Sequence, residues 1–277
     1  MTLPKGLFTM QGVYISNAEN ISGAENICGT LSQNVGIGGY SLLRAFLIRG
    51  GKASLLPGLV ARANTNATGV NAAGEVAGWA DTGVQGLGHH PDQHACVWQG
   101  GVLRDLGLLA ARKESTANGI NSAGQVVGDV GPPEHRHAVI WGSSGLTVLG
   151  KTGDSSAAAI NDKGQVVGNV GHHAELWEAG RSVGLESLRG YPLNAAKGIN
   201  AAGLIVGEAD DAEGLNGQAV IWIGGKVHDL NRLAPGCLGP WSGGGCQRKR
   251  ADCWSRHPCR GRARVSSDAG DAGVDRM

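Results

Sequence analysis

Short apolar runs and glycine-containing turns alternate along most of the chain. The runs combine β-branched, aromatic and small residues, as in Gln125-Val-Val-Gly128 and His137-Ala-Val-Ile-Trp141. Runs of this length and composition are typical of β-strands, and the glycine that follows each tryptophan predicts a hairpin. The pattern therefore predicts an all-β fold.

One turn element recurs along the chain, with starts near residues 21, 70, 120, 160 and 199. It reads Ile/Val-Asn-x-x-Gly followed by an apolar run, and the first copy, Ile21 to Gly29, is degraded. Asparagine bonds its own backbone two residues on, and glycine accepts a left-handed conformation without steric cost. The turn asparagines are therefore expected to be structural: Asn71, Asn121, Asn161 and Asn200.

A tryptophan and a leucine follow each turn at a constant spacing. The leucine comes eight residues after the tryptophan, as from Trp98 to Leu106, and from Ile48 to Leu56 in the first copy. A tryptophan at one strand position of every unit predicts a core between units; these residues are Trp98, Trp141, Trp177 and Trp222. A histidine shares one position in three units, where we expect it to hold the unit together through a backbone hydrogen bond; these are His94, His137 and His173.

The repeat is about 40–50 residues long with three or four strands, and this period is typical of a β-propeller blade. The expected fold is a propeller-like ring of about six blades whose last blade is incomplete. The segment Leu7–Asn17 looks like the end of a unit. We expect it to be an outer strand that closes the ring with the sixth repeat.

At these residues the chain resembles the HAF-repeat family of bacterial proteins, often described as probable extracellular repeat proteins. His173-Ala174 and Arg44-Ala45-Phe46 carry the His-Ala-Phe signature between them, over a region of about residues 7–236. The resemblance implies a propeller-like fold and an extracellular or periplasmic location, although the chain begins with no signal peptide. It assigns no activity to any residue.

Composition changes sharply near residue 236, so we divide the chain into a repeat domain, 1–236, and an Arg- and Cys-rich tail, 237–277. The tail holds eight of the 24 Lys and Arg residues and four of the 23 Asp and Glu residues, a net charge of +4, which leaves the body at −3. Back-translated and read one base later, Cys246–Trp254 can encode Val-Asn-Ala-Ser-Gly-Gln-Ile-Val-Gly. We therefore interpret the tail as an out-of-frame, disordered segment that replaces the sixth repeat.

Two other interpretations of the tail are weaker. Its cysteines with His257 lack the two-to-four-residue spacing of structural zinc sites, so no metal or other cofactor is predicted. Its arginines are an electrostatic footprint for nucleic acid but come without a motif, so no nucleic-acid partner is predicted. No apolar run is long enough to span a membrane.

One connection varies in length and is the candidate binding face. From the opening Ile or Val to the tryptophan the distance is 28 residues in the second copy (70 to 98) and 17 in the fourth (160 to 177). Insertions confined to one connection mark the usual binding face of a repeat fold. Residues there that break the repeat are the ligand-binding candidates: His89, His90, Asp92, His135 and the non-repeat Trp79.

No Gly-x-Ser-x-Gly, Walker A or His-Glu-x-x-His motif occurs, so no catalytic residue is predicted. The expected function is a non-catalytic module of an exported or cell-envelope protein that binds a glycan or a protein. Two alternatives stay open: a glycan-active hydrolase or lyase on the same face, and a degenerate gene fragment without function. Unpaired blade edges also predict self-association.

Overall fold

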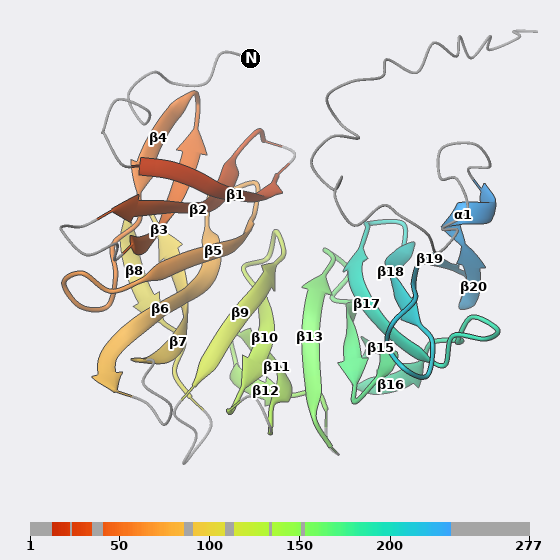
Figure 1. Cartoon of the computed structure of the whole chain (residues 1–277). Coiled ribbons are helices and arrows are strands. Elements are labelled where there is room, and N and C mark those ends of the chain that lie inside the picture. The colour runs from red at the N-terminus through yellow and green to blue at the C-terminus, as the bar shows by residue number, and fades with distance from the viewer. Residues whose placement is uncertain are drawn as a thin grey trace, which may run out of the picture. The chain divides into compact units, whose positions relative to one another are not determined.

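The computed structural model describes residues 13–22, 24–34, 41–85, 91–108, 114–132, 135–150 and 153–233. Contacts divide the chain into two units, Met1–Pro235 and Gly236–Met277, and only the first contains described residues. Its described part is built from strands and one short helix, α1 (Leu230–Leu233) (Figure 1). The predicted all-β class is confirmed.

The strands form five four-stranded antiparallel sheets, each a simple meander of consecutive strands. The first sheet contains β1 (Val13–Ile21), β2 (Ile27–Asn34), β3 (Ser41–Arg49) and β4 (Lys52–Leu55). The second contains β5 (Thr65–Val70), β6 (Val76–Gln85), β7 (Pro91–Gln99) and β8 (Val102–Asp105). The third contains β9 (Ser115–Ile120), β10 (Val126–Val130), β11 (His137–Gly142) and β12 (Gly145–Val148). The fourth contains β13 (Ser155–Ile160), β14 (Val166–Val170), β15 (His173–Glu178) and β16 (Arg181–Gly184), and the fifth contains β17 (Leu193–Ile199), β18 (Ile205–Asp210), β19 (Gly217–Ile223) and β20 (Lys226–Asp229).

Each sheet is one blade of a propeller-like arrangement. The first strand of every later blade packs on the second and third strands of the blade before it, as β5 does on β2 and β3. The first strands also contact one another in order, from β1 through β5, β9 and β13 to β17, so they line the inside (Figure 1). The propeller-like prediction is therefore confirmed, whereas the expected sixth blade falls on residues outside the described part.

The predicted role of the N-terminal segment is wrong for residues 13–17, whereas residues 7–12 lie outside the described part of the chain. Residues 13–17 belong to β1, which pairs with β2 and is the innermost strand of the first blade. The sequence instead predicts an outer strand of a sixth blade for Leu7–Asn17. The first repeat is more complete than its degraded turn suggests, because its inner strand precedes that turn.

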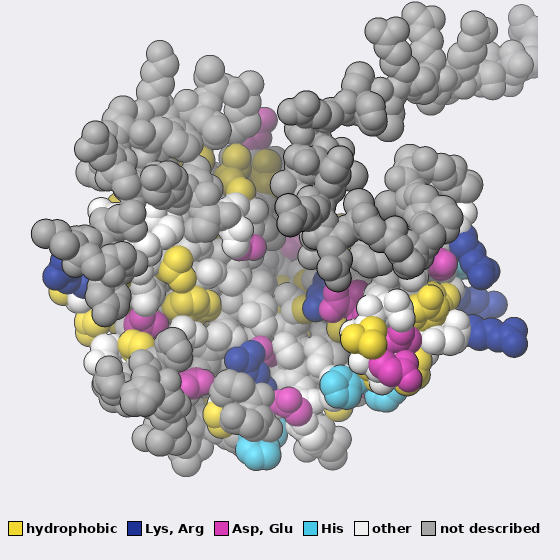
Figure 2. Space-filling view, viewed as in Figure 1, with side chains coloured by type: hydrophobic (Ala, Val, Ile, Leu, Met, Phe, Trp, Pro, Cys, Tyr) yellow, Lys and Arg dark blue, Asp and Glu magenta, His cyan; other side chains and the backbone are white. Residues whose placement is uncertain are grey.

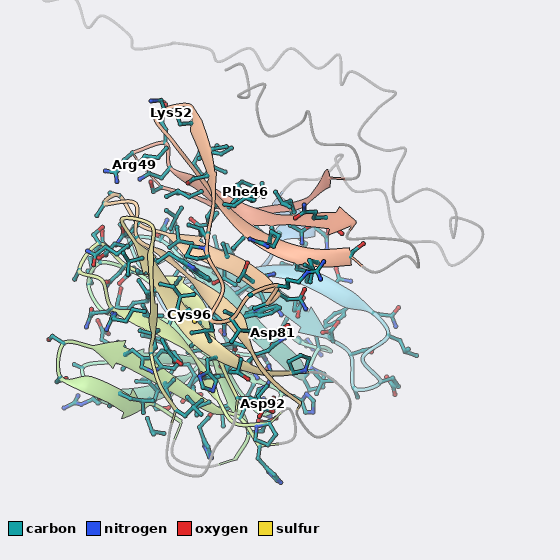
Figure 3. The ribbon with its side chains drawn as sticks, turned by 90° about the vertical axis from the view of Figure 1, so that its left-hand side faces the viewer. Phe46, Arg49, Lys52, Asp81, Asp92 and Cys96 are labelled. Carbon is teal, nitrogen blue, oxygen red and sulfur yellow. The ribbon has the colours of Figure 1, made fainter. Side chains whose placement is uncertain are left out.

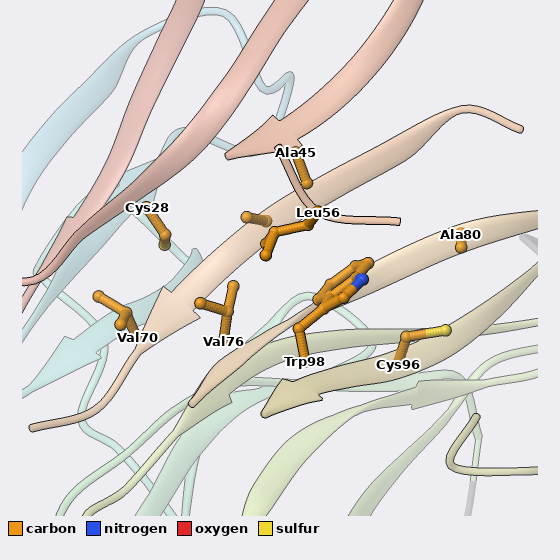
Figure 4. Close-up of a cluster of buried hydrophobic side chains, with 9 residues drawn as sticks. Cys28, Ala45, Leu56, Val70, Val76, Ala80, Cys96 and Trp98 are labelled. Atoms are coloured by element: carbon orange, nitrogen blue, oxygen red, sulfur yellow. The ribbon is translucent and has the colours of Figure 1, made fainter. Parts of the chain in front are cut away.

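The hydrophobic core is divided among the contacts between successive blades. Trp98 in the second blade packs with Cys28, Ala45 and Leu56 of the first, and all four side chains are buried (Figure 4). Trp141, Trp177 and Trp222 are also buried, each in a cluster that includes residues of the preceding blade. The indole Nε1 of Trp98 donates to Pro57 O at 2.7 Å, which ties the tryptophan to the linker between blades.

A repeated hydrogen-bond clip joins each of the first four blades to the next. The N–H of Ala95 in β7 donates to the Ser115 hydroxyl, at the start of the next blade, at 2.9 Å. Its carbonyl accepts from the N–H of Leu106 at 2.9 Å. The same pair of bonds forms at three other alanines, with Thr65, Ser155 and Asn194 as the side-chain acceptors: Ala45, Ala138 and Ala174. The alanine of the His-Ala element therefore bonds to the next blade through its N–H and to the Asp-Leu element of its own blade through its carbonyl.

The turn asparagines form a belt around the inside of the arc. Asn121 Oδ1 accepts from the backbone N–H of Ala123 at 3.1 Å and of Gln125 at 2.9 Å. Its amide Nδ2 donates to Gln125 Oε1 at 2.8 Å and across to Asn161 O in the next blade at 3.2 Å. Asn71 and Asn161 cross to the following blade in the same way. The turn bonds were predicted, and the crossing bonds were not.

The first turn reaches the same result with different residues. Glu25 occupies the position of the repeat glycine and adopts its left-handed conformation, with φ 57° against 81° for Gly74. Ser22 replaces the turn asparagine, and Asn26, four residues later, donates instead to Asn71 O and Ala72 O, both at 3.2 Å. The belt is therefore maintained although the sequence motif is degraded.

Candidate functional site

Each blade has two chemically different ends. The Asn-x-x-Gly turns and the tight hairpins between third and fourth strands share one end. The connections between second and third strands share the other end with the linkers between blades, and we call this the loop face. Histidine and acidic side chains gather along the lower edge of the view in Figure 2. Asp92 lies toward the loop end of the second blade, far from Arg49 and Lys52 in the hairpin of the first blade (Figure 3).

Of the four candidate residues of the second blade, the structure describes Asp92 and Trp79. His89 and His90 lie outside the described residues. Asp92 is buried in β7, and Trp79 is half-buried in β6, where it pairs with Asn66 and Ala95 in the backbone register. The structure therefore shows Asp92 and Trp79 inside the sheet.

The three repeat histidines have different surroundings, and the expected backbone bond is not what holds His94. Its Nδ1 lies 2.7 Å from Asp105 Oδ2, within the same blade, while Asp105 Oδ1 accepts from the N–H of Gly107 at 2.8 Å. The carboxylate thus links the histidine to the turn that follows β8. His173 is exposed and has Gly184 where the second blade has Asp105, so this pair cannot form in the fourth blade.

The junction of the third and fourth blades breaks the repeat in the linker. The linker is measured from the leucine that bonds the clip alanine to the side chain of the next blade that accepts from that alanine. This spacing is nine positions at the other three junctions, for example from Leu56 to Thr65, but six from Leu149 to Ser155. Beside this short linker His135, His137, Gly153 and Asp154 line a pocket of about 310 Å³ on the loop face. It brings the candidate His135 next to His137, a residue assigned only a structural role.

A polar network extends from this pocket into the interface. The backbone N–H of Arg136 donates to Asp154 Oδ1 at 2.8 Å, and its guanidinium lies 3.8 Å from Asp129 Oδ2. Asp129 is buried and accepts from the Ser156 hydroxyl and the Ala157 N–H, both at 3.1 Å, in the fourth blade. Burial raises the pKa of the Asp129 carboxyl, and the bonds from Ser156 and Ala157 oppose that rise.

A larger hollow lies between the same two blades. A groove of about 670 Å³ runs from Ile140, Val148 and Leu149 to the β15–β16 hairpin, where Glu175 and Arg181 form its rim. Trp177 lines it, and the indole Nε1 of Trp177 is buried without a hydrogen-bond partner. In the fifth blade the corresponding atom of Trp222 donates to Glu186 O in a nine-residue linker at 2.8 Å. The shorter linker thus accompanies the groove. The unpaired indole is not specific to this junction, because the Nε1 of Trp141 is also buried without a hydrogen-bond partner, although its linker, from Leu106 to Ser115, has the nine-residue spacing.

The acidic side chain at the centre of this junction is held by several hydrogen bonds. The Asp129 oxygens accept hydrogen bonds from Asn118 in the third blade and from Ser156 and Ala157 in the fourth, so the carboxylate is held in place between the two blades. Within the described ranges no group of three or more His, Cys, Asp or Glu side chains is arranged to hold a metal ion. In the same part of the chain no helix is long and apolar enough to cross a membrane.

The sequence predicts His135 as a ligand-binding candidate, and the structure places it at this junction, whereas Asp129, Arg136 and Asp154 were not predicted and the candidate Trp79 lies in the second blade. Asp129 occupies the strand position of Trp79 and Asn169, and nothing in its local sequence marks it as buried. The signal that was available is the linker, because six residues in place of nine distinguish this junction in the sequence itself.

The fold and site define a propeller-type repeat module. No protein-family model matches the chain, and no curated protein matches it. Among solved structures, the chain is similar to the β-propeller domain of the Trilobed protease from Pyrococcus furiosus, described as having an open velcro topology. The identity is 9%, the TM-score is 0.38, and the match covers 79% of this chain and 96% of that one.

Proposed function

We propose that the protein is a non-catalytic binding module whose loop face takes a glycan or protein ligand at the junction of the third and fourth blades. The observation that carries the proposal is the pocket lined by His135, His137 and Asp154 beside the shortened linker. Here the non-repeat His135 lines a hollow on the face with variable connections.

The surrounding network supports binding over turnover. Asp154 is fixed by the N–H of Arg136, and Asp129 is fixed by the fourth blade. Imidazole and carboxylate groups beside one another in a pocket favour recognition of hydroxyl or amide groups, which both glycans and peptide backbones offer. An exported location remains part of the proposal and rests on the family resemblance.

Binding is tested with immobilised glycans and with a proteome pull-down, using the chain and its His135→Ala/His137→Ala double variant. We expect the double variant to lose at least tenfold in affinity for whatever the chain retains. His173→Ala is the matched control, because His173 has the same repeat position as His137 but does not line the pocket. Equal retention by all three proteins would contradict the site, and release of cleaved glycan would favour the hydrolase or lyase alternative.

A further inference from the structure

The fifth blade exposes the surface that every other blade uses to hold its successor. The second residue of the second strand is fully buried in the first four blades: Cys28, Ala77, Val127 and Val167, each 0% exposed. The equivalent Val206 is 43% exposed. Ala219 is likewise exposed, whereas the clip alanines Ala45, Ala95, Ala138 and Ala174 are 0% exposed.

The first blade exposes the complementary surface. In each later blade the last residue of the inner strand packs against the second residue of the second strand of the blade before it, as Val70 does in one cluster with Cys28. Ile21 holds this position in the first blade and is 64% exposed, compared with 5% for Val70 and 9% for Ile160. Ala18 is exposed too, although its equivalents, such as Ala67 and Ala157, are 0% exposed.

We propose that the fifth blade of one chain binds the first blade of a second copy, head to tail, through the contact that joins neighbouring blades within the chain. In this interface β1 of the second copy lies on β18 and β19, as β17 lies on β14 and β15. Ile21 covers Val206, and the inner strand covers Ala219. The chain already makes this contact four times between its own blades, so a second copy is the partner that carries a matching surface.

A polar contact strengthens the match. In the second and third blades the bulge residue of the inner strand donates to the inner strand of the next blade, from Thr68 to Ala117 O at 2.8 Å and from Asn118 to Ala157 O at 2.9 Å. Lys197 is the bulge residue of the fifth blade, and its exposed ammonium pairs with Glu208 at 2.8 Å. In the proposed interface Lys197 reaches the carbonyl of Ala18, which corresponds in register to Ala117 and Ala157.

A head-to-tail contact joins two different surfaces, so it propagates into rings or open chains rather than stopping at a dimer. It requires no ligand and is independent of the proposed loop-face function. Burial of Val206 and Ile21 supplies apolar contact, at about 25 cal/mol for each Å² removed from water. Both side chains are solvent-exposed in the single chain, so replacing either with a charged residue tests association without disrupting the hydrophobic core.

The experiment is multi-angle light scattering of the full chain under reducing conditions, over at least a hundredfold range of concentration. Val206→Asp and Ile21→Asp each remove one half of the contact, and we expect each variant alone to keep the mass of one chain where the unaltered protein grows. An equal mixture of the two retains one intact pair of surfaces and should give twice that mass and no more. Val102→Asp, on the outer strand β8 at a residue that is 70% exposed, is the control and should associate like the unaltered protein.

Three results would overturn the proposal. The unaltered chain could keep the mass of one chain at every concentration, which would leave the surface to another repeat unit or to closure within one molecule. Val206→Asp could associate as strongly as the control, or the mixture could fail to exceed one chain mass. If Val206→Asp lowers the melting temperature, Val206→Ser repeats the test with a smaller change.

Discussion

Replacing Asn121 with alanine should expose how much the crossing bonds of the belt contribute to stability. The side chain is buried and serves two backbone donors in its own turn, the Gln125 side chain and a carbonyl of the next blade. Each such bond contributes about 0.5–1.5 kcal/mol net, and a buried partner left unpaired costs about 1–3 kcal/mol. We expect Asn121→Ala to lower the free energy of unfolding by about 3 kcal/mol.

Asn200→Ala is the matched comparison for this measurement. Asn200 is exposed, and its Oδ1 makes the same two turn bonds, to Ala202 and Leu204, at 3.0 and 2.9 Å. It belongs to the last described blade, and no bond from its amide to a following blade is present in the described part. We expect this variant to cost about 1 kcal/mol, from the two turn bonds alone.

The assay is urea unfolding followed by tryptophan fluorescence, with both variants and the unaltered chain at one protein concentration. The difference between the two variants reports the crossing bond together with the burial of its partners. If the two substitutions cost the same within about 0.5 kcal/mol, the belt has no energetic role between blades and the reasoning fails.

Three further predictions concern single residues. Glu25→Gly should stabilise the chain by about 0.5–1 kcal/mol in urea unfolding, because Glu25 has φ 57°, whereas Glu25→Ala should bring no such gain. Burial raises the folded-state pKa of Asp129, so the folded chain binds a proton more readily than the unfolded chain, and the contribution of this group to stability increases as the pH falls. In thermal melts between pH 7 and pH 4, the stability of Asp129→Asn relative to the unaltered chain should therefore decrease toward acid. Burial also raises the pKa of both Cys28 and Cys96 to about 12, so mass mapping after iodoacetamide treatment at pH 8 should find these two thiols unmodified in the folded chain and modified after unfolding; modification in the folded chain would contradict their burial.

The repeat elements that the sequence predicts are those built from residue types with one typical structural role. Glycine at position 74 and its equivalents signals a left-handed turn, and tryptophan at a fixed strand position signals a buried contact. The pairing of Ala95 with Ser115 was not predicted, because a small residue and a serine twenty positions apart carry no local signal. The same reason applies to Glu25, whose left-handed conformation is visible only when the turn is aligned with its four intact copies.

Candidate ligand residues were harder to predict because burial decides their role. Asp92 and Asp129 are both acidic residues at strand ends, and the structure places both inside. Asp129 is distinguished by donors from the next blade, Ser156 and Ala157, which are far away in the sequence. His135 differs from the histidines at repeat positions because it lies outside the strands, where neither the clip nor the belt constrains it.

The contacts between blades explain why a binding site would arise at one junction rather than everywhere. The clip, the belt and the tryptophan cluster occupy fixed positions in every blade, so changes there would weaken an interface that the fold repeats four times. Linkers contact the tryptophans of two junctions but lie outside the belt, and a spacing of six residues in place of nine leaves the clip between Ala138 and Ser155 intact at 3.0 Å. The shorter linker is instead accompanied by a groove and by a pocket beside His135. A change that hollows the surface without disturbing the interface is the kind that a repeat protein can acquire for binding at little cost to its stability.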